Sequence, residues 1–269
     1  MGYFRVTNPL PSVYHLEDVR GVFATLLIGS QKALLVDTAM GIGNIAKEVS
    51  GITTLPLTVV NTHGHTDHTL GNYQFPKVYL ARGDWELAKM CGAVEVKRRL
   101  LALSAIVPPD FDQEAYLNYK YDNLVPLEEG TVFDLGELSV RPVPLPSHSP
   151  GSMGFLCPEL GLLMSGDSVA PLVCLVFPES SSVSEHIKML KKVKELPFSR
   201  ILSSHSERLI PREEIELYLK CAGSVDRSKT VKYKSPLFPD YPGRMFFCGD
   251  SVKKGEFAAI VYSESKLTQ

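Results

Sequence analysis

Short apolar segments alternate with turn-forming residues over the first eighty positions, a pattern typical of β-strands. The turn at residues 29–32 (Gly-Ser-Gln-Lys) indicates a hairpin between two of these strands. We expect strands over residues 12–16, 22–28, 33–36, 57–62 and 77–80, and a short helix over residues 43–49.

Residues 82–126 change to a helical pattern, which begins at Asp84 as the expected N-cap and stops at a Pro-Pro pair. The run Lys97, Arg98 and Arg99 reads as a solvated helix face. We expect this inserted segment to form a lid or wall of a pocket, or an additional packing layer with solvated tyrosines.

Strand and helix signals alternate again after the insertion, so the chain reads as an α/β protein. One helix should begin with Pro211 at its first position and end at Gly223. We treat residues 1–223 as one domain and residues 224–269 as a C-terminal extension packed on it. Further strands are expected over 137–143, 154–157, 161–165 and 200–203, a helix over 185–196, and a hairpin from 245–248 and 257–262.

Composition narrows the class of protein, its partners and its cellular compartment. The chain has 269 residues, of which 44% are hydrophobic and 22% charged, and its net charge is −2, so we expect a globular protein with no nucleic-acid partner. Five widely spread cysteines without a CxxC pair favour a reduced, cytoplasmic compartment. The longest apolar stretch, residues 169–177, is far shorter than the roughly 20 residues of a membrane span.

One octapeptide carries the strongest chemical signal. Residues 61–68 read Asn-Thr-His-Gly-His-Thr-Asp-His and directly follow an apolar strand. Imidazole and carboxylate are ligands that zinc and similar cations prefer. His63 and His65 can turn to one side and chelate one ion, whereas the adjacent Asp67 and His68 fit a second ion beside the first.

Three later segments follow the same plan, because each runs from an apolar strand into a single residue of ligand type: His148, Asp167 and His205. Functional groups gather beyond strand ends in layered α/β proteins, so these residues can converge with the octapeptide. The two remaining histidines, His15 and His186, are expected to be structural.

These motifs together resemble the metallo-β-lactamase superfamily. They are His63-x-His65-x-Asp67-His68, then His148 in a Ser-His-Ser-Pro-Gly-Ser segment, then Asp167 after Ser-Gly, then His205. The resemblance covers about residues 12–210 and implies a four-layer αββα sandwich with two metals at one edge.

The resemblance also implies a ligand set. One metal would be held by His63, His65 and His148, and the other by Asp67, His68 and His205, with Asp167 bridging them. We expect two zinc ions, with iron or manganese as alternatives, and a bridging water activated as the nucleophile. Asp67 would orient that water and protonate the leaving group. Asp37 could support a ligand histidine, although a turn-forming role is the simpler interpretation.

Subfamily differences narrow the activity to a small-molecule hydrolase acting on an ester, thioester, lactone or amide bond. True β-lactamases of the superfamily have cysteine or serine in place of Asp167, and flavin-linked diiron reductases have glutamate in place of His65. Lactonases carry a tyrosine after the bridging aspartate, where this chain has Ser168 and Val169. Phosphodiester hydrolysis and iron-dependent redox chemistry remain alternatives.

A serine nucleophile is a weaker alternative. Residues 166–170 (Gly-Asp-Ser-Val-Ala) match a loose GxSxA pattern, but Pro171 does not fit a helix starting from that turn. We expect residues 170–182 to form a pocket wall, with Cys174 outside the ligand set because the set is already complete.

Overall fold

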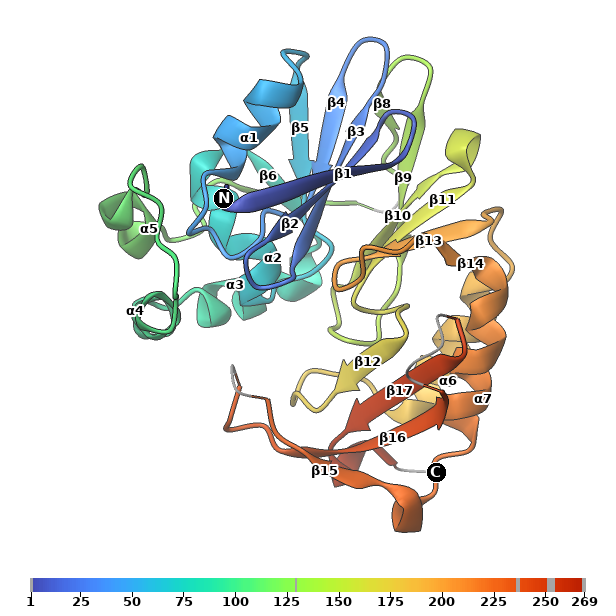
Figure 1. Cartoon of the computed structure of the whole chain (residues 1–269). Coiled ribbons are helices and arrows are strands. Elements are labelled where there is room, and N and C mark those ends of the chain that lie inside the picture. Colours follow the sequence, from blue (N-terminus) through green and yellow to red (C-terminus); the bar gives the residue numbers. More distant parts are fainter. Residues whose placement is uncertain (1, 129, 236–237, 251–254, 268–269) are drawn as a thin grey trace.

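The computed structural model describes residues 2–128, 130–235, 238–250 and 255–267. Two β-sheets pack against each other with helices on their outer faces, and a third, smaller sheet lies beneath one edge of this sandwich (Figure 1). Loops from both sheets meet at that edge.

The first sheet has seven strands in sequence order, antiparallel from β1 to β4 and parallel from β4 onward. Alternate residues point to opposite faces, so Leu27 and Leu34 face the second sheet while Leu26 and Leu35 face helix α1 (Ile45–Ile52). The strands are β1 (Phe4–Leu10), β2 (Val13–Asp18), β3 (Phe23–Ile28), β4 (Ala33–Val36), β5 (Leu57–Val60), β6 (Val78–Leu80) and β7 (Leu124–Pro126).

The second sheet has six strands in the order β14-β13-β11-β10-β9-β8. Its inner face contributes Phe155 and Met164 to the core between the sheets, and its outer face packs Leu163 against α6 (Val183–Val193) and α7 (Ile215–Gly223). The expected αββα sandwich is therefore confirmed. The strands are β8 (Phe133–Asp134), β9 (Ser139–Pro144), β10 (Met153–Cys157), β11 (Leu162–Gly166), β13 (Arg200–Ser203) and β14 (Ile210–Pro211).

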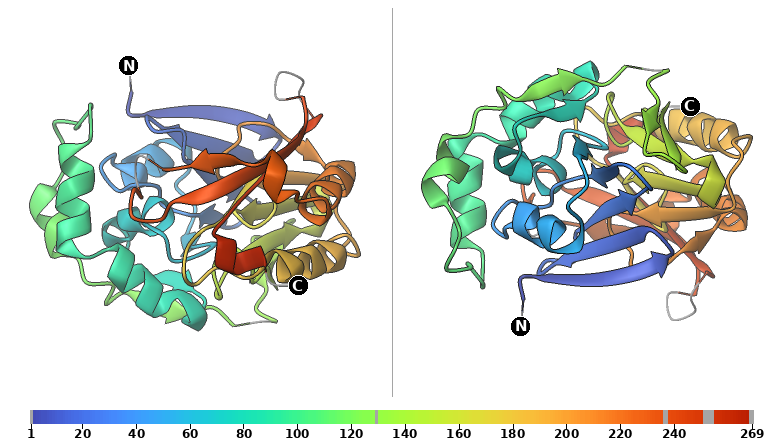
Figure 2. Two further views of the ribbon diagram at one scale, coloured as in Figure 1. Left: turned by 90° about the horizontal axis from the view of Figure 1, so that it is seen from below. Right: turned by 90° about the horizontal axis from the view of Figure 1, so that it is seen from above.

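The inserted segment forms α3 (Trp85–Cys91), α4 (Val94–Ala102) and α5 (Gln113–Asn118), on the opposite side of the molecule from α6 and α7 in all views (Figures 1 and 2). Its tyrosines Tyr116 and Tyr121 are buried rather than solvated. The expectation of a solvated basic face is wrong for Lys97, which is buried and donates to the Tyr119 carbonyl at 2.6 Å. Burial lowers the pKa of Lys97 to about 8.

The third sheet unites two distant parts of the chain, in the order β12-β17-β16-β15. Strand β12 (Leu172–Leu175) pairs in parallel with β17 (Phe257–Tyr262), which forms the expected hairpin with β16 (Gly243–Gly249); β15 (Val231–Tyr233) completes the sheet. Residues 172–175 are thus a strand within the segment expected to be a pocket wall. The division into a domain and an extension stays a prediction.

Other differences from expectation are local. Strand β1 was not expected, and α7 begins at Ile215 because Pro211 ends β14 and a 3₁₀ turn intervenes. The five cysteines are free. No helix in the described part of the chain has the length and apolar character needed to cross a membrane. Short helical turns lie at Thr66–Thr69 (α2), Leu70–Gln74, Arg82–Asp84, Pro158–Leu160, Arg212–Glu214, Arg227–Lys229 and Glu264–Leu267.

Candidate metal centre

The loops that follow β5, β9, β11 and β13 meet at one edge of the sandwich and bring all seven predicted side chains together. Their ligand atoms form three groups in which every atom lies within 4.8 Å of the others. The groups are His63, His65 and His148; His63, His68 and Asp167; and Asp67, His68 and His205. We refer to these seven residues as the ligand cluster.

Three histidines of the cluster turn lone pairs toward one another. His148 Nδ1 donates to the Cys174 carbonyl at 2.7 Å, and His65 Nε2 donates to Glu179 at 3.0 Å. Their other nitrogens, His148 Nε2 and His65 Nδ1, are therefore unprotonated in the neutral rings, yet they lie 2.8 Å apart. Two lone pairs at this distance repel unless a cation lies between them, so the pair fits a bound metal.

His63 completes this group through a relay to Asp37. Thr62 Oγ1 donates to Asp37 at 2.8 Å and so accepts from His63 Nδ1 at 3.0 Å. His63 Nε2 is left as a third lone pair, 3.1 Å from His65 Nδ1. The hydrogen bonds around the three rings thus select the tautomers that a metal requires.

Asp37 also fixes His68, since His68 Nδ1 donates to Asp37 Oδ2 at 2.9 Å. The turn-forming interpretation of Asp37 is therefore incomplete: the residue has a φ of 66°, and its buried carboxylate also supports two histidines of the cluster. The opposite nitrogen, His68 Nε2, has no hydrogen-bond partner and faces Asp67 at 3.5 Å and Asp167 at 3.7 Å. An orphaned buried nitrogen between two carboxylates again fits a cation.

Asp167 lies at the centre of the cluster. Its Oδ2 is 3.2 Å from His205 Nε2 and 3.6 Å from His148 Nε2, so one carboxylate reaches both histidine groups. Burial would lower the pKa of His205, but Asp167 and Asp67 outweigh it and raise that pKa to about 10. Burial would raise the pKa of both carboxyl groups, and the histidines hold them below their usual range instead. The cluster therefore favours positive charge at its centre.

Asp84 ties two of the metal-ligand loops together. The expected N-cap at Asp84 makes no side-chain cap; instead its buried carboxylate accepts from Gly64 N at 2.8 Å, Gly151 N at 2.7 Å and Ser149 Oγ at 2.5 Å. A Cβ added at Gly151 would lie 2.7 Å from the Asp84 side chain, so only glycine allows this approach. The loops carrying His63, His65 and His148 are thereby held in register.

Glu179 contacts the ligand cluster, and sequence reasoning missed it. It lies between β12 and α6, and its contact with His65 spans 114 residues. Burial would raise the pKa of the Glu179 carboxyl, but the hydrogen bond with His65 and neighbouring donors lower it overall. An isolated glutamate beyond a strand gave no periodic or motif signal that could have identified it.

A pocket of about 490 Å³ opens above the cluster. One wall comes from β12 and the residues after it, and another from the C-terminal segment, through Tyr233, Ser235 and Phe238. None of the described residues 82–126 lines this pocket, and a lid function for that segment stays a prediction. The remaining lining residues are His65, Asp67, His148, Asp167, Ala170, Pro171, Leu172, Cys174, Val176, Phe177, Ser203, His205 and Ser206.

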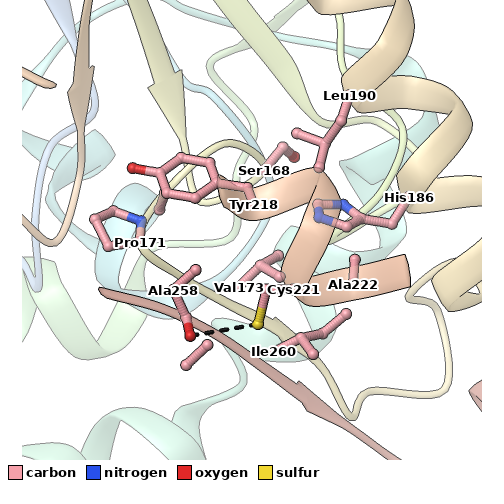
Figure 3. A pocket seen from close by; sticks show the side chains of 12 residues that line it. Ser168, Pro171, Val173, His186, Leu190, Tyr218, Cys221, Ala222, Ala258 and Ile260 are labelled. Atoms are coloured by element: carbon pink, nitrogen blue, oxygen red, sulfur yellow. Dashed lines mark hydrogen bonds between the residues drawn. The ribbon is translucent and has the colours of Figure 1, made fainter. Parts of the chain in front are cut away.

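Ser168 does not lie in that pocket. It lines a separate cavity of about 10 Å³ together with His186, Leu190 and Tyr218 (Figure 3), which is room for about one water. Its hydroxyl donates to the Leu145 carbonyl at 2.9 Å, and its side chain is buried. No substrate can reach Ser168 in this arrangement, which disfavours the serine mechanism.

Comparison with known proteins agrees with this geometry. The chain is 26% identical over 192 residues to the acyl-coenzyme A thioesterase MBLAC2 of Bos taurus, covering 64% of this chain and 66% of that relative's length. A beta-lactamase domain protein from Burkholderia ambifaria matches 80% of this chain and 71% of its own, with a TM-score of 0.57 and 20% identity.

A second solved structure, TTHA1623 in a di-iron-bound form, matches 71% of this chain and 90% of its own, with a TM-score of 0.50 and 23% identity. At these identities the two solved structures support the fold alone. The metallo-beta-lactamase superfamily model matches residues 18–205, which is more than half of the chain and contains the whole ligand cluster. The chain therefore belongs to the metallo-beta-lactamase superfamily.

Proposed function

We propose that this protein is a binuclear metal-dependent hydrolase that cleaves an ester, thioester, lactone or amide bond of a small molecule. The proposal depends on one arrangement: the unprotonated nitrogens of His63, His65 and His148 face one another, and His68 Nε2 beside them has no hydrogen-bond partner. The Asp167 carboxylate reaches both groups of histidines. The relative MBLAC2 is an acyl-coenzyme A thioesterase, which supports a hydrolytic assignment.

The donor set suits two cations of zinc-like character. His63, His65 and His148 would hold one, Asp67, His68 and His205 the other, and Asp167 would bridge them. Five imidazoles and two carboxylates fit zinc, iron or manganese, and the di-iron form of TTHA1623 keeps iron among the candidates. We favour two zinc ions because zinc promotes hydrolysis as a Lewis acid and has no redox chemistry of its own.

When bound, two cations supply Lewis acidity toward a carbonyl oxygen and lower the pKa of water. The remaining work falls to the chain. Asp67 and Asp167 face the pocket floor, where Asp67 can orient the attacking water and pass a proton to the leaving group. Asp37, Glu179 and the Cys174 carbonyl keep the histidine tautomers fixed through the reaction.

The charge of the pocket favours carbonyl substrates over phosphodiesters. A basic rim would be expected for an anionic scissile group, but the pocket-lining residues in the described ranges include no Lys or Arg. We therefore place phosphodiester hydrolysis second.

A substrate panel with defined metals tests the proposal. The metal-free protein would be reconstituted with zinc, manganese or iron and assayed on a thioester, a lactone, a phosphodiester and a β-lactam. We expect turnover of the carbonyl substrates only with about two equivalents of metal, and loss of turnover in His63→Ala. Full activity of a metal-free preparation would contradict the proposal.

A further inference from the structure

The pocket above the ligand cluster has two chemically different ends. Near His205 the lining is polar and includes Ser203 and Ser206. Near His65 and His148 it is apolar, because the Phe177 ring lies 4.7 Å from the His65 ring and 5.7 Å from the His148 ring. A substrate held across the cluster would thus have one polar and one apolar neighbourhood.

The apolar end is built from an aromatic cluster that joins two distant segments. Phe177 packs edge to face with Phe238 at 5.5 Å and with Tyr241 at 5.4 Å between ring centroids. Tyr233 and Met245 pack on the same group. Rings held in this way offer a fixed apolar surface that loses little entropy when a ligand binds.

Strand β12 adds aliphatic surface to the same wall. Its side chains alternate, so Val173 and Leu175 are buried in the core beneath α6 and α7 while Leu172 and Cys174 line the pocket. Leu172 remains 41% exposed and lines the pocket. An exposed leucine inside a concave apolar wall marks surface that a ligand can bury.

The orientation of a substrate follows from the proton donor. Under the proposed function, Asp67 protonates the leaving group, and Asp67 lies 3.3 Å from His205 at the polar end. The leaving group would therefore face Ser203 and Ser206, and the acyl group would extend the other way, toward Phe177 and Phe238.

We propose that the wall formed by Leu172, Val176, Phe177, Tyr233 and Phe238 is an acyl-chain site, which selects neutral esters or thioesters with an extended apolar acyl group. This inference rests on the proposed hydrolase function. Water attacks the carbonyl carbon, the bond to the thiol or alcohol breaks, and that group leaves with a proton while the acid is released. No oxidant or further reactant is needed.

Acyl thioesters of one thiol test the site directly. With the zinc-loaded full chain, kcat/KM should rise about three- to fourfold for each added methylene from acetyl toward octanoyl. A matched series with a constant acetyl group and lengthening thiols should stay nearly flat. Equal rates along the acyl series, or a slope found only in the thiol series, would overturn the assignment.

Variants of the wall link that slope to named residues. Leu172→Ala and Phe238→Ala should each lower the octanoyl-to-acetyl ratio of kcat/KM by about tenfold. The control Phe247→Ala removes a ring that is 46% exposed on β16 and does not line the pocket, so the ratio should not change. If Phe238→Ala fails to fold, the exposed Leu172 still decides the outcome, because an unchanged ratio in Leu172→Ala contradicts the proposal.

Binding of the product acids separates this inference from the hydrolase function. The melting temperature of the zinc-loaded protein would be measured with acetate, butanoate, hexanoate and octanoate at equal concentration. Stabilisation that grows with chain length, without turnover of any thioester, would retain the acyl site and reject the hydrolase. Turnover without any dependence on chain length would retain the hydrolase function and reject the acyl site.

Discussion

The ligand cluster and the two buried histidines elsewhere in the chain differ in what their ring nitrogens face. His15 uses both nitrogens, with Thr25 Oγ1 at 2.9 Å and the Ser206 carbonyl at 3.1 Å, and its ring stacks on Phe23. His186 bonds Ser147 Oγ at 2.6 Å inside the helical layer. In the ligand cluster one nitrogen of each fixed ring is bonded and the other faces a second lone pair or a carboxylate.

This difference separates a metal site from a structural histidine more sharply than burial does. His63, His68, His15 and His186 are all buried, with exposures of at most 2%. Burial alone would give them the same function. What distinguishes the cluster is that its second ring nitrogens face one another or a carboxylate, an arrangement that is costly in a closed core and useful where a cation can bind.

The largest expected effect comes from Asp167→Asn, which removes the carboxylate shared by both halves of the cluster. We expect kcat/KM to fall at least about 10³-fold because a neutral amide cannot bridge two cations. Metal content by mass spectrometry should drop below two equivalents. Asp226→Asn, at a partly exposed carboxylate, is the control. Wild-type metal content and turnover in Asp167→Asn would show that the cluster is no different from a structural histidine site.

Acidification of the metal-free protein tests the two structural histidines, His15 and His186. Burial lowers the pKa of His15 and of His186 to about 4. Below pH 6.5 these two histidines bind protons in the unfolded chain but stay neutral in the folded protein. The free energy of unfolding therefore falls as the pH drops from 6.5 to about 4. Each histidine can contribute up to about 3 kcal/mol to this loss.

Urea unfolding between pH 4.5 and 7.5 measures that slope. His186→Gln keeps a hydrogen-bonding group beside Ser147 but cannot titrate, so it should lose its share of the pH dependence. An unchanged slope in His186→Gln would mean that His186 is not held neutral.

Asp84→Asn tests whether Asp84 holds the loops of the ligand cluster in place. The amide presents an N–H₂ group to donors that now bond a carboxylate, so the loops of His65 and His148 should lose register. We expect metal affinity to weaken by about 10- to 100-fold, measured by competition with a chelator. Asp112→Asn, at the cap of α5, should leave metal affinity unchanged. Equal metal affinity in both variants would contradict a positioning function for Asp84.

The smallest effect is expected for Glu179→Gln. The amide oxygen can still accept from His65 Nε2, but the charge that makes His65 a stronger ligand is lost. Metal affinity should fall by about tenfold, and Glu179→Asp should recover part of it. Glu195→Gln, at an exposed position, serves as the control. A larger loss than in Asp84→Asn would reverse the order of importance proposed for these two supports.

Much of the sandwich and all residues of the ligand cluster could be predicted from the sequence. Cluster residues are rare types placed directly after apolar strands, so pattern and chemistry coincide at the same positions. Strand β1 was missed because Arg5, Thr7 and Asn8 interrupt its apolar pattern at a sheet edge. Edge strands keep few buried side chains and so leave a weak periodic signal.

The residues that hold the cluster in place, Asp84 and Glu179, and the pocket wall could not be predicted in the same way. Asp84 bonds Ser149 across 65 residues, and Glu179 reaches His65 across 114. Each is a common residue type whose function arises only from a tertiary contact. The misassigned Lys97 illustrates the same point, because its long aliphatic stem packs inward while its neighbours Arg98 and Arg99 stay exposed.

The parallel pairing of β12 with β17 has a consequence for how the protein matures. Residues through His205 leave the ribosome well before β17, which follows about 50 residues later. In that interval all seven residues of the ligand cluster have been synthesised, but β12 lacks its partner strand β17. Tyr233 and Phe238, two of the five residues of the proposed acyl wall, also follow His205 in the chain. A nascent chain of this kind should capture metal before it can discriminate between substrates, so selectivity is acquired last.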